Sequence, residues 1–551
     1  MIYSQSQLTL SVEGTLNKQA ARSTSRHVDE VAQTAFPHAQ ESIHTSPQDD
    51  DARNTANSLT SRLDVEGSEH RVMQSTPPEL SNFANEIVFV LLCSMGLLLF
   101  GVFLGDVLVN QLIFPRALRV TEGSTPWLVG SFLLANGVTV IIAGSVIDLL
   151  DPKLPMTLAF GWLVIWNLVL VFSIHPGRAI LFFVARGMQG VAVGVLQASS
   201  MSLLGRLYAP GLRKNRIFSL MAAMAPIGFL IGCLKGGALE AHLPWIFAAN
   251  AILSGLCVTA SIWCIPAFAP ASNSSILEDF DGLGALCAAV GCGLVIFGLT
   301  QGAPSGWQPY TYSTIVAGML CFGLFYLAEQ RAARPLIDNR LWTTPGFTPL
   351  AISYFLGYGA YIGGWMFYAV RFFLSIQQKA PITVALYLIP NLVSGIAATW
   401  VVSRTLHLVP GHWLLAVGMI AFTMGPVFFL PQTATTTYWA LAMPGIALVT
   451  FGPDLTFAAA SIFITSSVPK SFQGAAGSLL VTIQNLSAAI GTALADTVGQ
   501  RVNHGAGYDL DLGALRAIWW LSLGMAVVAA LICAIFMQIP ALNALSLGYV
   551  K

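Results

Sequence analysis

The sequence contains little charge. Asp, Glu, Lys and Arg make up 9% of its 551 residues, whereas soluble globular proteins carry about 25%. The 26 basic and 26 acidic residues balance, so no overall field favours nucleic acid, and none is expected as a partner. Hydrophobic residues reach 55%, which excludes an ordinary soluble domain and predicts a membrane protein.

Motifs of enzyme chemistry are also missing. The chain has no GxxxxGK(S/T) phosphate loop and no GxSxG or HExxH sequence. We therefore predict no catalytic residues, no cofactor and no use of ATP. The eight cysteines lie in apolar stretches without CxxC pairs or histidines at metal spacing, which predicts inert thiols and no metal site.

The first 85 residues differ from the rest of the chain. They are rich in Ser, Thr, Gln and mixed charge and show no sustained apolar period. Such a segment buries too little surface to offset its ordering entropy, so we predict a disordered cytoplasmic tail over residues 1–85. No basic stretch followed by an apolar one is present there, so a secretory signal is not expected.

After Glu86 the chain is a series of apolar segments about twenty residues long, the length that crosses a hydrocarbon core of ~30 Å. Backbone groups find no water there, so each segment is expected to be helical. The fourteen expected helices are Ile87–Ile113, Trp127–Ile147, Leu154–Ile174, Ala179–Leu204, Ile217–Leu239, Leu243–Ile265, Leu283–Gln301, Tyr312–Leu327, Phe347–Val370, Ile382–Val402, Trp413–Leu430, Tyr438–Ile464, Gly474–Val498 and Ile518–Ile539.

Charge in the loops predicts the orientation. The loop Arg206–Arg216 holds four basic residues and Arg331–Arg340 holds three, so we place these loops and both termini in the cytoplasm. The sequon at Asn273 then lies in the cytoplasm and should carry no glycan. The plasma membrane is the expected location, with the vacuolar membrane as the alternative. The opposite loops also carry basic residues, namely Arg116, Arg119, Arg178, Arg371, Lys379, Arg501 and Arg516.

Arg186 lies in the middle of the fourth segment, where an arginine costs roughly 2.5 to 3.5 kcal/mol on insertion scales. We therefore expect it to face the protein interior or a wet cavity. Its predicted role is a cation that pairs with a carboxylate or senses its protonation, and the alternative is a structural bridge. Gln189 would add a second hydrogen bond between helices.

Three acids lie within apolar segments. Asp106, near the end of the first segment, could exchange a proton, although at a membrane end it could also be fully hydrated. Asp454 and Asp496 are further membrane acids, in the twelfth and thirteenth segments. We predict coupling or gating roles for Asp106 and Asp454.

The loop after the second segment carries Asp148. A helix N-terminus or a basic neighbour such as Arg213 or Arg216 could hold this carboxylate and so latch one side of the molecule closed. The alternative is a solvated turn.

Two segments carry glycine patterns. In the fifth, Pro226 is followed by glycines at a four-residue period, which is typical of a close helix contact. These are Gly228, Gly232 and Gly236. In the ninth, glycines alternate with Tyr358, Tyr361 and Trp365, which could line a substrate cavity. Core packing is the alternative, and Asn110, Gln484 and Asn485 would add polar lining.

Five motifs follow in a defined order. They are Asp106-x-x-x-Asn110 with Pro115, Gly144-x-x-x-Asp148 with Lys153, Phe182-x-x-x-Arg186-x-x-Gln189-Gly190, Ala225-Pro226 with its glycines, and Phe280-Asp281-Gly282-Leu283-Gly284 through Trp307. Together they resemble the major facilitator superfamily, specifically the fourteen-helix drug:proton antiporter branch in a fungal version similar to aminotriazole-resistance-type transporters. The resemblance covers about residues 86 to 540. It departs from the family pattern at Leu149, Ala225 and Phe229-Leu230.

The resemblance implies an all-α polytopic fold of two six-helix bundles plus two additional helices. The implied domains are 86–266, a linker with the inserted pair at 267–345, 346–540, and a short tail at 541–551. It also implies proton-coupled efflux of a small organic compound by alternating access, in a monomer whose partners are substrate, protons and the lipid bilayer. An importer or facilitator of a small ion or nutrient and a non-transporting receptor are the alternatives.

Overall fold

A computed structural model describes most of the apolar part of the chain. The described residues are 83–147, 150–208, 212–266, 280–332, 335–337, 340–405, 409–468, 473–503 and 510–537. The predictions for the tail up to residue 82, for Asp148, for Asn273 and for residues 541–551 lie outside them. Residues 83–85 were assigned to the tail by sequence, but they form the first turn of a helix.

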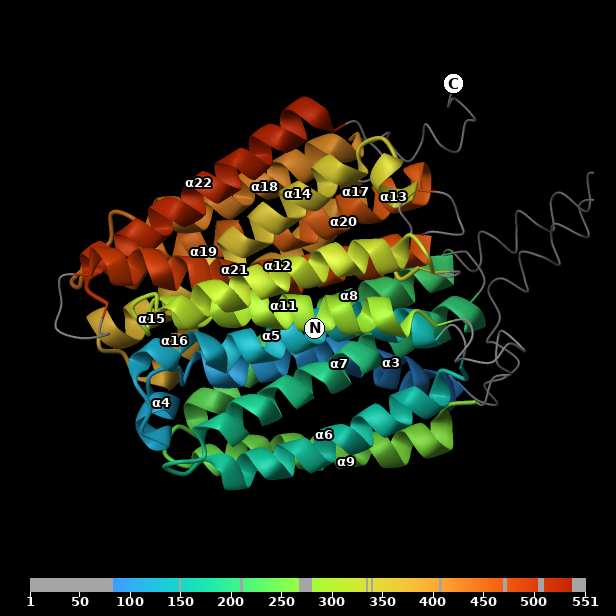
Figure 1. The fold of residues 1–551 in the computed structure, drawn as a ribbon, viewed down its shortest axis with the longest axis horizontal. Coiled ribbons are helices and arrows are strands. Elements are labelled where there is room, and N and C mark those ends of the chain that lie inside the picture. The colour runs from blue at the N-terminus through green and yellow to red at the C-terminus, as the bar shows by residue number, and fades with distance from the viewer. Residues whose placement is uncertain are drawn as a thin grey trace, which may run out of the picture. The chain divides into compact units, whose positions relative to one another are not determined.

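The described regular elements are all helical (Figure 1). The first half of the chain forms α3 (Phe83–Leu108), α4 (Ile113–Leu118), the 3-10 turn η1 (Glu122–Ser124), α5 (Pro126–Ile147), α6 (Lys153–Ser173), α7 (Ala179–Leu207), α8 (Leu212–Ala238), α9 (Leu243–Cys264), α11 (Gly282–Gly302) and α12 (Pro309–Glu329). The second half forms α13 (Arg340–Thr343), α14 (Phe347–Tyr358), η2 (Gly359–Met366), α15 (Phe367–Arg371), η3 (Phe372–Ile376), α16 (Pro381–Tyr387), α17 (Ile389–Thr405), α18 (Gly411–Phe429), η4 (Tyr438–Ala442), α19 (Met443–Val449), α20 (Phe451–Ser467), α21 (Gln473–Val502) and α22 (Leu512–Phe536).

The fourteen predicted crossings are confirmed. Thirteen described helices are long and apolar enough to span a bilayer. The fourteenth is the continuous run α14–η2–α15–η3, in which η2 and η3 have π-helical hydrogen bonding. The last span begins at Leu512 instead of the predicted Ile518, because the Asp511 carboxylate accepts a hydrogen bond from the Ala514 backbone N–H at 2.7 Å and caps the helix.

The first span ends earlier than expected, at Leu108 instead of Ile113. The chain then turns through Asn110, whose backbone N–H bonds the Val107 carbonyl, before α4 begins at Ile113. Asn110 therefore lies beyond the helix, in the turn that leads away from it.

The helices form the two expected bundles. In Figure 1 the helices from α3 to α9 (blue to green) lie together, and those from α14 to α22 (yellow to red) form a second group. Contacts between α5 and α21, and between α8 and both α16 and α17, join the bundles. The inserted helices α11 and α12 pair with one another, and α11 also contacts α5 and α21.

Glycine lets α3 and α8 pack backbone against backbone. A Cβ atom at Gly232 would lie 2.8 Å from the Val102 Cα, and one at Gly236 would lie 2.7 Å from the Asp106 carbonyl oxygen. Gly228 meets the backbone of Leu98 in the same way. The predicted helix-contact role of the glycine period after Pro226 is therefore confirmed.

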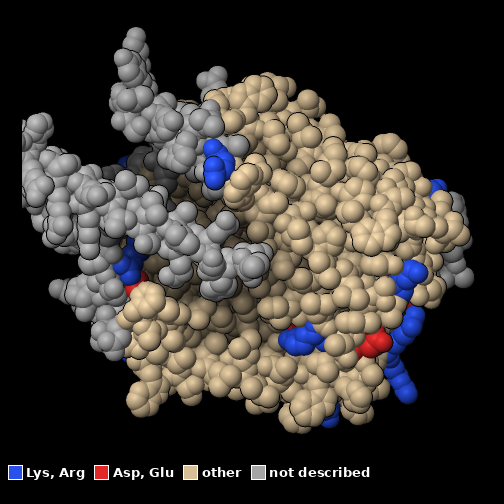
Figure 2. Space-filling model, turned by 180° about the vertical axis from the view of Figure 1, so that it is seen from behind, with Lys and Arg blue, Asp and Glu red and all other residues tan. Residues whose placement is uncertain are grey.

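The outer surface of the described helices suits lipid. Large apolar side chains point outward, among them Trp263 and Ile180, which are 86% and 81% exposed. Figure 2 shows a face on which most described side chains are uncharged and only a few Lys, Arg, Asp and Glu side chains appear. Exposed apolar area on this scale is incompatible with a surface in water.

Candidate functional site

Arg186 lies inside the first bundle and is fully buried. Its Nε donates to the Leu128 carbonyl oxygen at 3.2 Å, and one terminal nitrogen donates to the Phe103 carbonyl at 3.0 Å. The other terminal nitrogen donates to Gln189 Oε1 at 2.6 Å, and the guanidinium carbon lies 4.9 Å from the centre of the Phe132 ring. The guanidinium therefore ties α7 to α3 and α5 through neutral partners.

Gln189 extends this network, as predicted, because its amide donates to Asn167 Oδ1 of α6 at 2.7 Å. The direct pairing of Arg186 with a carboxylate is not observed among the described residues, since its hydrogen bonds go to carbonyl and amide oxygens. Arg186 interacts with Asp106 only at longer range, through its charge.

Asp106 is fully buried and pairs with Lys235 of α8, whose Nζ lies 3.0 Å from Asp106 Oδ2. The Asn250 amide of α9 donates to the same oxygen at 2.8 Å, and Lys235 Nζ also donates to Asn250 Oδ1. Asp106 Oδ1 has no hydrogen-bond partner among the described residues. A polar cluster of these three residues therefore joins α3, α8 and α9.

Lys235 and Asn250 were not among the site residues predicted from the sequence. Lys235 lies near the end of the predicted segment Ile217–Leu239, where a long basic side chain can reach the membrane surface, so the argument used for Arg186 is weaker there. Asn250 could not be identified from the sequence, because a single asparagine in an apolar helix is not unusual.

Asn110, predicted to line a cavity, is fully buried and donates to the carbonyl oxygens of Gly236 at 2.9 Å and Asp106 at 3.0 Å. Asn485 of α21 donates to Asn136 Oδ1 of α5 at 2.8 Å, so it joins the two bundles. Gln484 beside it is half-buried. Both asparagines are therefore engaged in contacts between helices.

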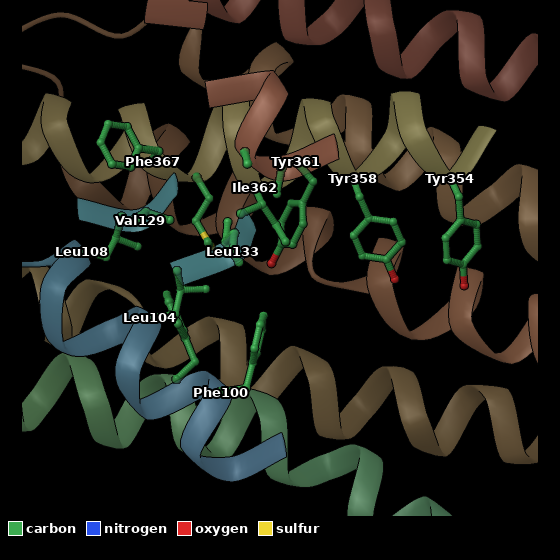
Figure 3. Packing of buried hydrophobic residues seen from close by; sticks show 14 of the residues in the cluster. Phe100, Leu104, Leu108, Val129, Leu133, Tyr354, Tyr358, Tyr361, Ile362 and Phe367 are labelled. Atoms are coloured by element: carbon green, nitrogen blue, oxygen red, sulfur yellow. The ribbon is translucent and has the colours of Figure 1, made fainter. Parts of the chain in front are cut away.

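Three tyrosines follow one face of the α14–η2 run and point the same way (Figure 3). The Tyr354 hydroxyl donates to the Thr456 carbonyl at 3.1 Å, and the Tyr358 hydroxyl donates to the Pro453 carbonyl at 3.3 Å. Tyr361 stacks on Trp365 with ring centres 5.8 Å apart. None of these four side chains is more than 7% exposed. The π-helical turns that widen this helix often mark functional positions.

One end of the two bundles is held closed. Arg371 of α15 donates to Glu122 Oε2 at 2.6 Å, and Gln111 donates to the Phe367 carbonyl at 3.1 Å. Asp496 of α21, also nearly buried, interacts electrostatically with Arg371. Figure 3 shows apolar side chains of both bundles meeting at this end, namely Leu104, Leu108, Val129, Leu133, Ile362 and Phe367, and we call this set the bundle seal. On the predicted orientation the seal faces away from the cytoplasm.

At the opposite end, Arg213 donates to both carboxylate oxygens of Glu86, at 3.0 and 2.5 Å, and the Tyr208 hydroxyl donates to Glu86 at 2.9 Å. Arg213 was a predicted partner of Asp148, which lies outside the described residues. Asp148 as a latch therefore stays a prediction. Arg206 donates to the Ile147 carbonyl at 3.1 Å and so covers the end of α5.

The sequence matches the family model described as "Major Facilitator Superfamily" over residues 87–492. The chain belongs to the Major Facilitator Superfamily. It is thus a multi-pass membrane transporter of a small molecule and not an enzyme.

The names of curated relatives of this superfamily member indicate different activities. A low affinity ammonium transporter of Saccharomyces cerevisiae is 31% identical over 75% of this chain and 81% of its own length. The efflux pump terJ of Aspergillus terreus is 28% identical over 83% of this chain and 88% of its own length. The aminotriazole resistance protein of S. cerevisiae is 27% identical over 82% and 84%.

Solved structures share the fold of this transporter. A peptide transporter POT in complex with alafosfalin has a TM-score of 0.61, and the match covers 84% of this chain and 98% of that one. Its sequence is 13% identical, so the likeness concerns the fold alone. The match agrees with two six-helix bundles as the transport unit.

Proposed function

We propose that this protein is a proton-coupled exporter of a small organic compound, from the fourteen-helix drug:proton antiporter branch, acting as a monomer in the plasma membrane. The fourteen crossings and the order of the five motifs support the branch. The names of two relatives, an efflux pump and an aminotriazole resistance protein, support outward transport of a toxic compound.

The observation that carries the proposal is the ion pair of the fully buried Asp106 with the half-buried Lys235. A proton on Asp106 would neutralise its carboxylate and leave Lys235 with the amide of Asn250 as its polar partner. Lys235 is half-buried, and a partly desolvated cation that loses its counter-charge is less stable, so protonation favours a different packing of the helices that hold the pair. Because α3 and α8 touch backbone to backbone through glycine, the change in pairing would act directly on their contact.

Arg186 has a separate role in this mechanism. Its hydrogen bonds to α3 and α5 keep the first bundle together, and its positive charge acts on the Asp106 carboxylate at longer range. We assign Arg186 as a residue that tunes the proton occupancy of Asp106, with Gln189 holding its orientation. The closed bundle seal would then be one end state of alternating access.

The proton gradient supplies enough energy for this task. A potential of ~100 mV provides roughly 2.3 kcal/mol per proton, and a difference of ~1 pH unit provides roughly 1.4 kcal/mol. Together these support an accumulation of several hundred-fold for a neutral substrate exchanged for one proton.

The test uses proteoliposomes with an imposed pH gradient. The substrate is first chosen by a growth screen on toxic compounds, aminotriazole included, in cells that lack or overproduce the protein. Asp106→Asn should abolish proton-driven uptake, whereas Asp281→Asn, a carboxylate change at the cap of α11, should leave it intact. Accumulation that survives a protonophore, or that Asp106→Asn does not alter, would refute proton coupling through this residue.

A second candidate function is import of a small ion or nutrient, favoured by the relative named as an ammonium transporter. The direction of flux in intact cells separates the two. Export predicts lower cellular content of the toxic compound in overproducing cells, and import predicts higher content. A chain that binds ligand but gives no flux in either direction would instead be a receptor.

A further inference from the structure

Asp454 of α20 is a membrane acid that the proposed proton mechanism does not use. It is partly buried in the middle of its span, and it makes no hydrogen bond or ion pair with any residue that the structure describes. Asp106 differs, because Lys235 and Asn250 both bind its carboxylate. A carboxylate without a counter-charge inside a transporter either binds a proton or takes a cation from outside the chain.

The neighbours of Asp454 are polar on one side. Both Tyr358 and Tyr361 lie close enough to interact electrostatically with its carboxylate, and the Asn391 amide of α17 also lies near the Tyr361 hydroxyl. Phenol and amide oxygens accept hydrogen bonds, as a carboxylate does. Near Asp454, therefore, acceptors gather while no described Lys or Arg pairs with it.

Aromatic rings adjoin these polar groups. The Tyr361 ring stacks on Phe422 with centres 5.2 Å apart, and Trp365 stacks on Tyr361. Figure 3 shows Tyr361 and Tyr358 with their hydroxyls turned away from their own helix, toward the helices that face it. These rings give the neighbourhood a flat apolar wall next to its acceptors.

Gly395 of α17 faces the carboxylate, and the contacts around it admit a methyl group but no larger side chain. A Cβ atom placed there would lie 3.6 Å from Asp454 Oδ2, 3.8 Å from the Thr450 methyl and 4.0 Å from the Pro226 Cβ of α8. Pro226 belongs to the first bundle and Asp454 to the second, so the acid lies where the bundles meet. In transporters of this architecture, substrates bind near the membrane midplane between the two repeats.

We propose that Asp454, with the hydroxyl oxygens of Tyr358 and Tyr361 and the amide oxygen of Asn391, binds the protonated amine of a transported substrate. The N–H groups of an ammonium donate to these acceptors, and the carboxylate supplies the charge. Any apolar part of the substrate lies against the Tyr361–Phe422 stack. This inference rests on the proposed transport function and specifies its substrate class as protonated amines.

Binding to the full chain in nanodiscs tests the site without any proton gradient. The probes are benzylamine, its neutral counterpart benzyl alcohol, and benzyltrimethylammonium, which keeps the charge but has no N–H group. We expect benzylamine to bind at least tenfold more tightly than either counterpart. Equal affinity for benzylamine and benzyl alcohol would overturn the proposal.

Two pairs of variants locate the binding. Asp454→Asn should weaken benzylamine binding at least tenfold, and Asp454→Glu should retain most of it. Gly395→Leu should cover the carboxylate and block binding, whereas Gly395→Ala, whose methyl group makes only ordinary contacts, should weaken binding far less. Wild-type affinity in both Asp454→Asn and Gly395→Leu would refute the site.

Competition with ammonium chloride distinguishes two ligands that carry the same N–H donors, the free ammonium ion and an organic amine. If excess ammonium displaces benzylamine, the site accepts the free ion, and if it does not, the organic group is required. Asp106→Asn should keep benzylamine affinity while losing proton-driven transport. If Asp106→Asn loses transport but keeps binding, the result supports the amine site independently of the coupling mechanism. If only Asp454→Asn loses binding, the coupling mechanism through Asp106 is not affected.

Discussion

Replacing Lys235 by methionine removes the counter-charge of Asp106 while keeping most of the side-chain volume. The carboxylate of Asp106 would then keep the Asn250 amide as its hydrogen bond, since its Oδ1 is already unpartnered among the described residues. Breaking a buried pair by removing one partner costs about 3–5 kcal/mol. The carboxyl can escape this penalty by binding a proton.

Proton uptake sets an upper limit on the cost. An aspartic acid in water has a pKa of about 3.9, so protonating it at pH 7 costs about 4 kcal/mol, and at pH 5 only about 1.5 kcal/mol. Lys235→Met should therefore lower the free energy of unfolding by up to about 4 kcal/mol at pH 7, and by much less at pH 5. Adding Asp106→Asn removes the stranded charge and should recover most of the loss.

Denaturant titration in mixed micelles at the two pH values measures these quantities for the wild type, both single variants and the double variant. We expect a coupling free energy of about 2–3 kcal/mol between the two positions at pH 7. A cost below about 1 kcal/mol for Lys235→Met at pH 7, or no recovery in the double variant, would show that the pair does not hold a charged carboxylate.

Two further predictions concern helix contact and closure. Gly232→Ala should separate α3 from α8 and sharply lower the yield of folded protein, because its methyl group would overlap the Val102 backbone. The control is Gly161→Ala, whose methyl group would have no atom within 4 Å and which should leave the thermal unfolding temperature unchanged or slightly raised. Glu122→Gln should loosen the bundle seal by removing the charge bound to Arg371, so that a cysteine at Leu108 reacts about tenfold faster with an impermeant maleimide. Unchanged labelling relative to Leu108→Cys alone would show that the pair does not keep this end closed.

Much of the architecture could be predicted from the sequence, because the bilayer imposes a simple rule on it. Apolar runs of the right length must be helices, so thirteen spans and the composite fourteenth were found close to their true bounds. The errors lie where a local polar contact decides the end. The Asp511 cap makes the last helix begin at Leu512, six residues before the predicted Ile518. The first helix ends at Leu108 instead of the predicted Ile113.

The candidate site was only partly predictable. Arg186 and Asp106 were predicted as charges within the membrane, and both are buried. Of the two predicted roles of Arg186, a direct ion pair with a carboxylate is not observed among the described residues, and sensing of protonation stays a prediction. Lys235 takes the carboxylate, and Arg186 binds carbonyl oxygens and Gln189. Which side chains pair between two helices depends on how each helix is rotated about its axis. A nearly uniform apolar sequence does not allow this rotation to be predicted.

By itself the sequence determined that this protein crosses the membrane many times and that charges within its spans face inward, because polar groups are costly in lipid. It also determined that a glycine period marks a close helix contact, because glycine lets two backbones approach. Tertiary structure decided which of those charges meet. It placed Lys235 beside Asp106 and joined Glu122 to Arg371 across the two bundles. It left Asp454 at their junction without a hydrogen bond or ion pair to any described residue. These outcomes depend on distances of a few ångströms between helices far apart in the chain, since ion pairing in a low dielectric is decided at that range.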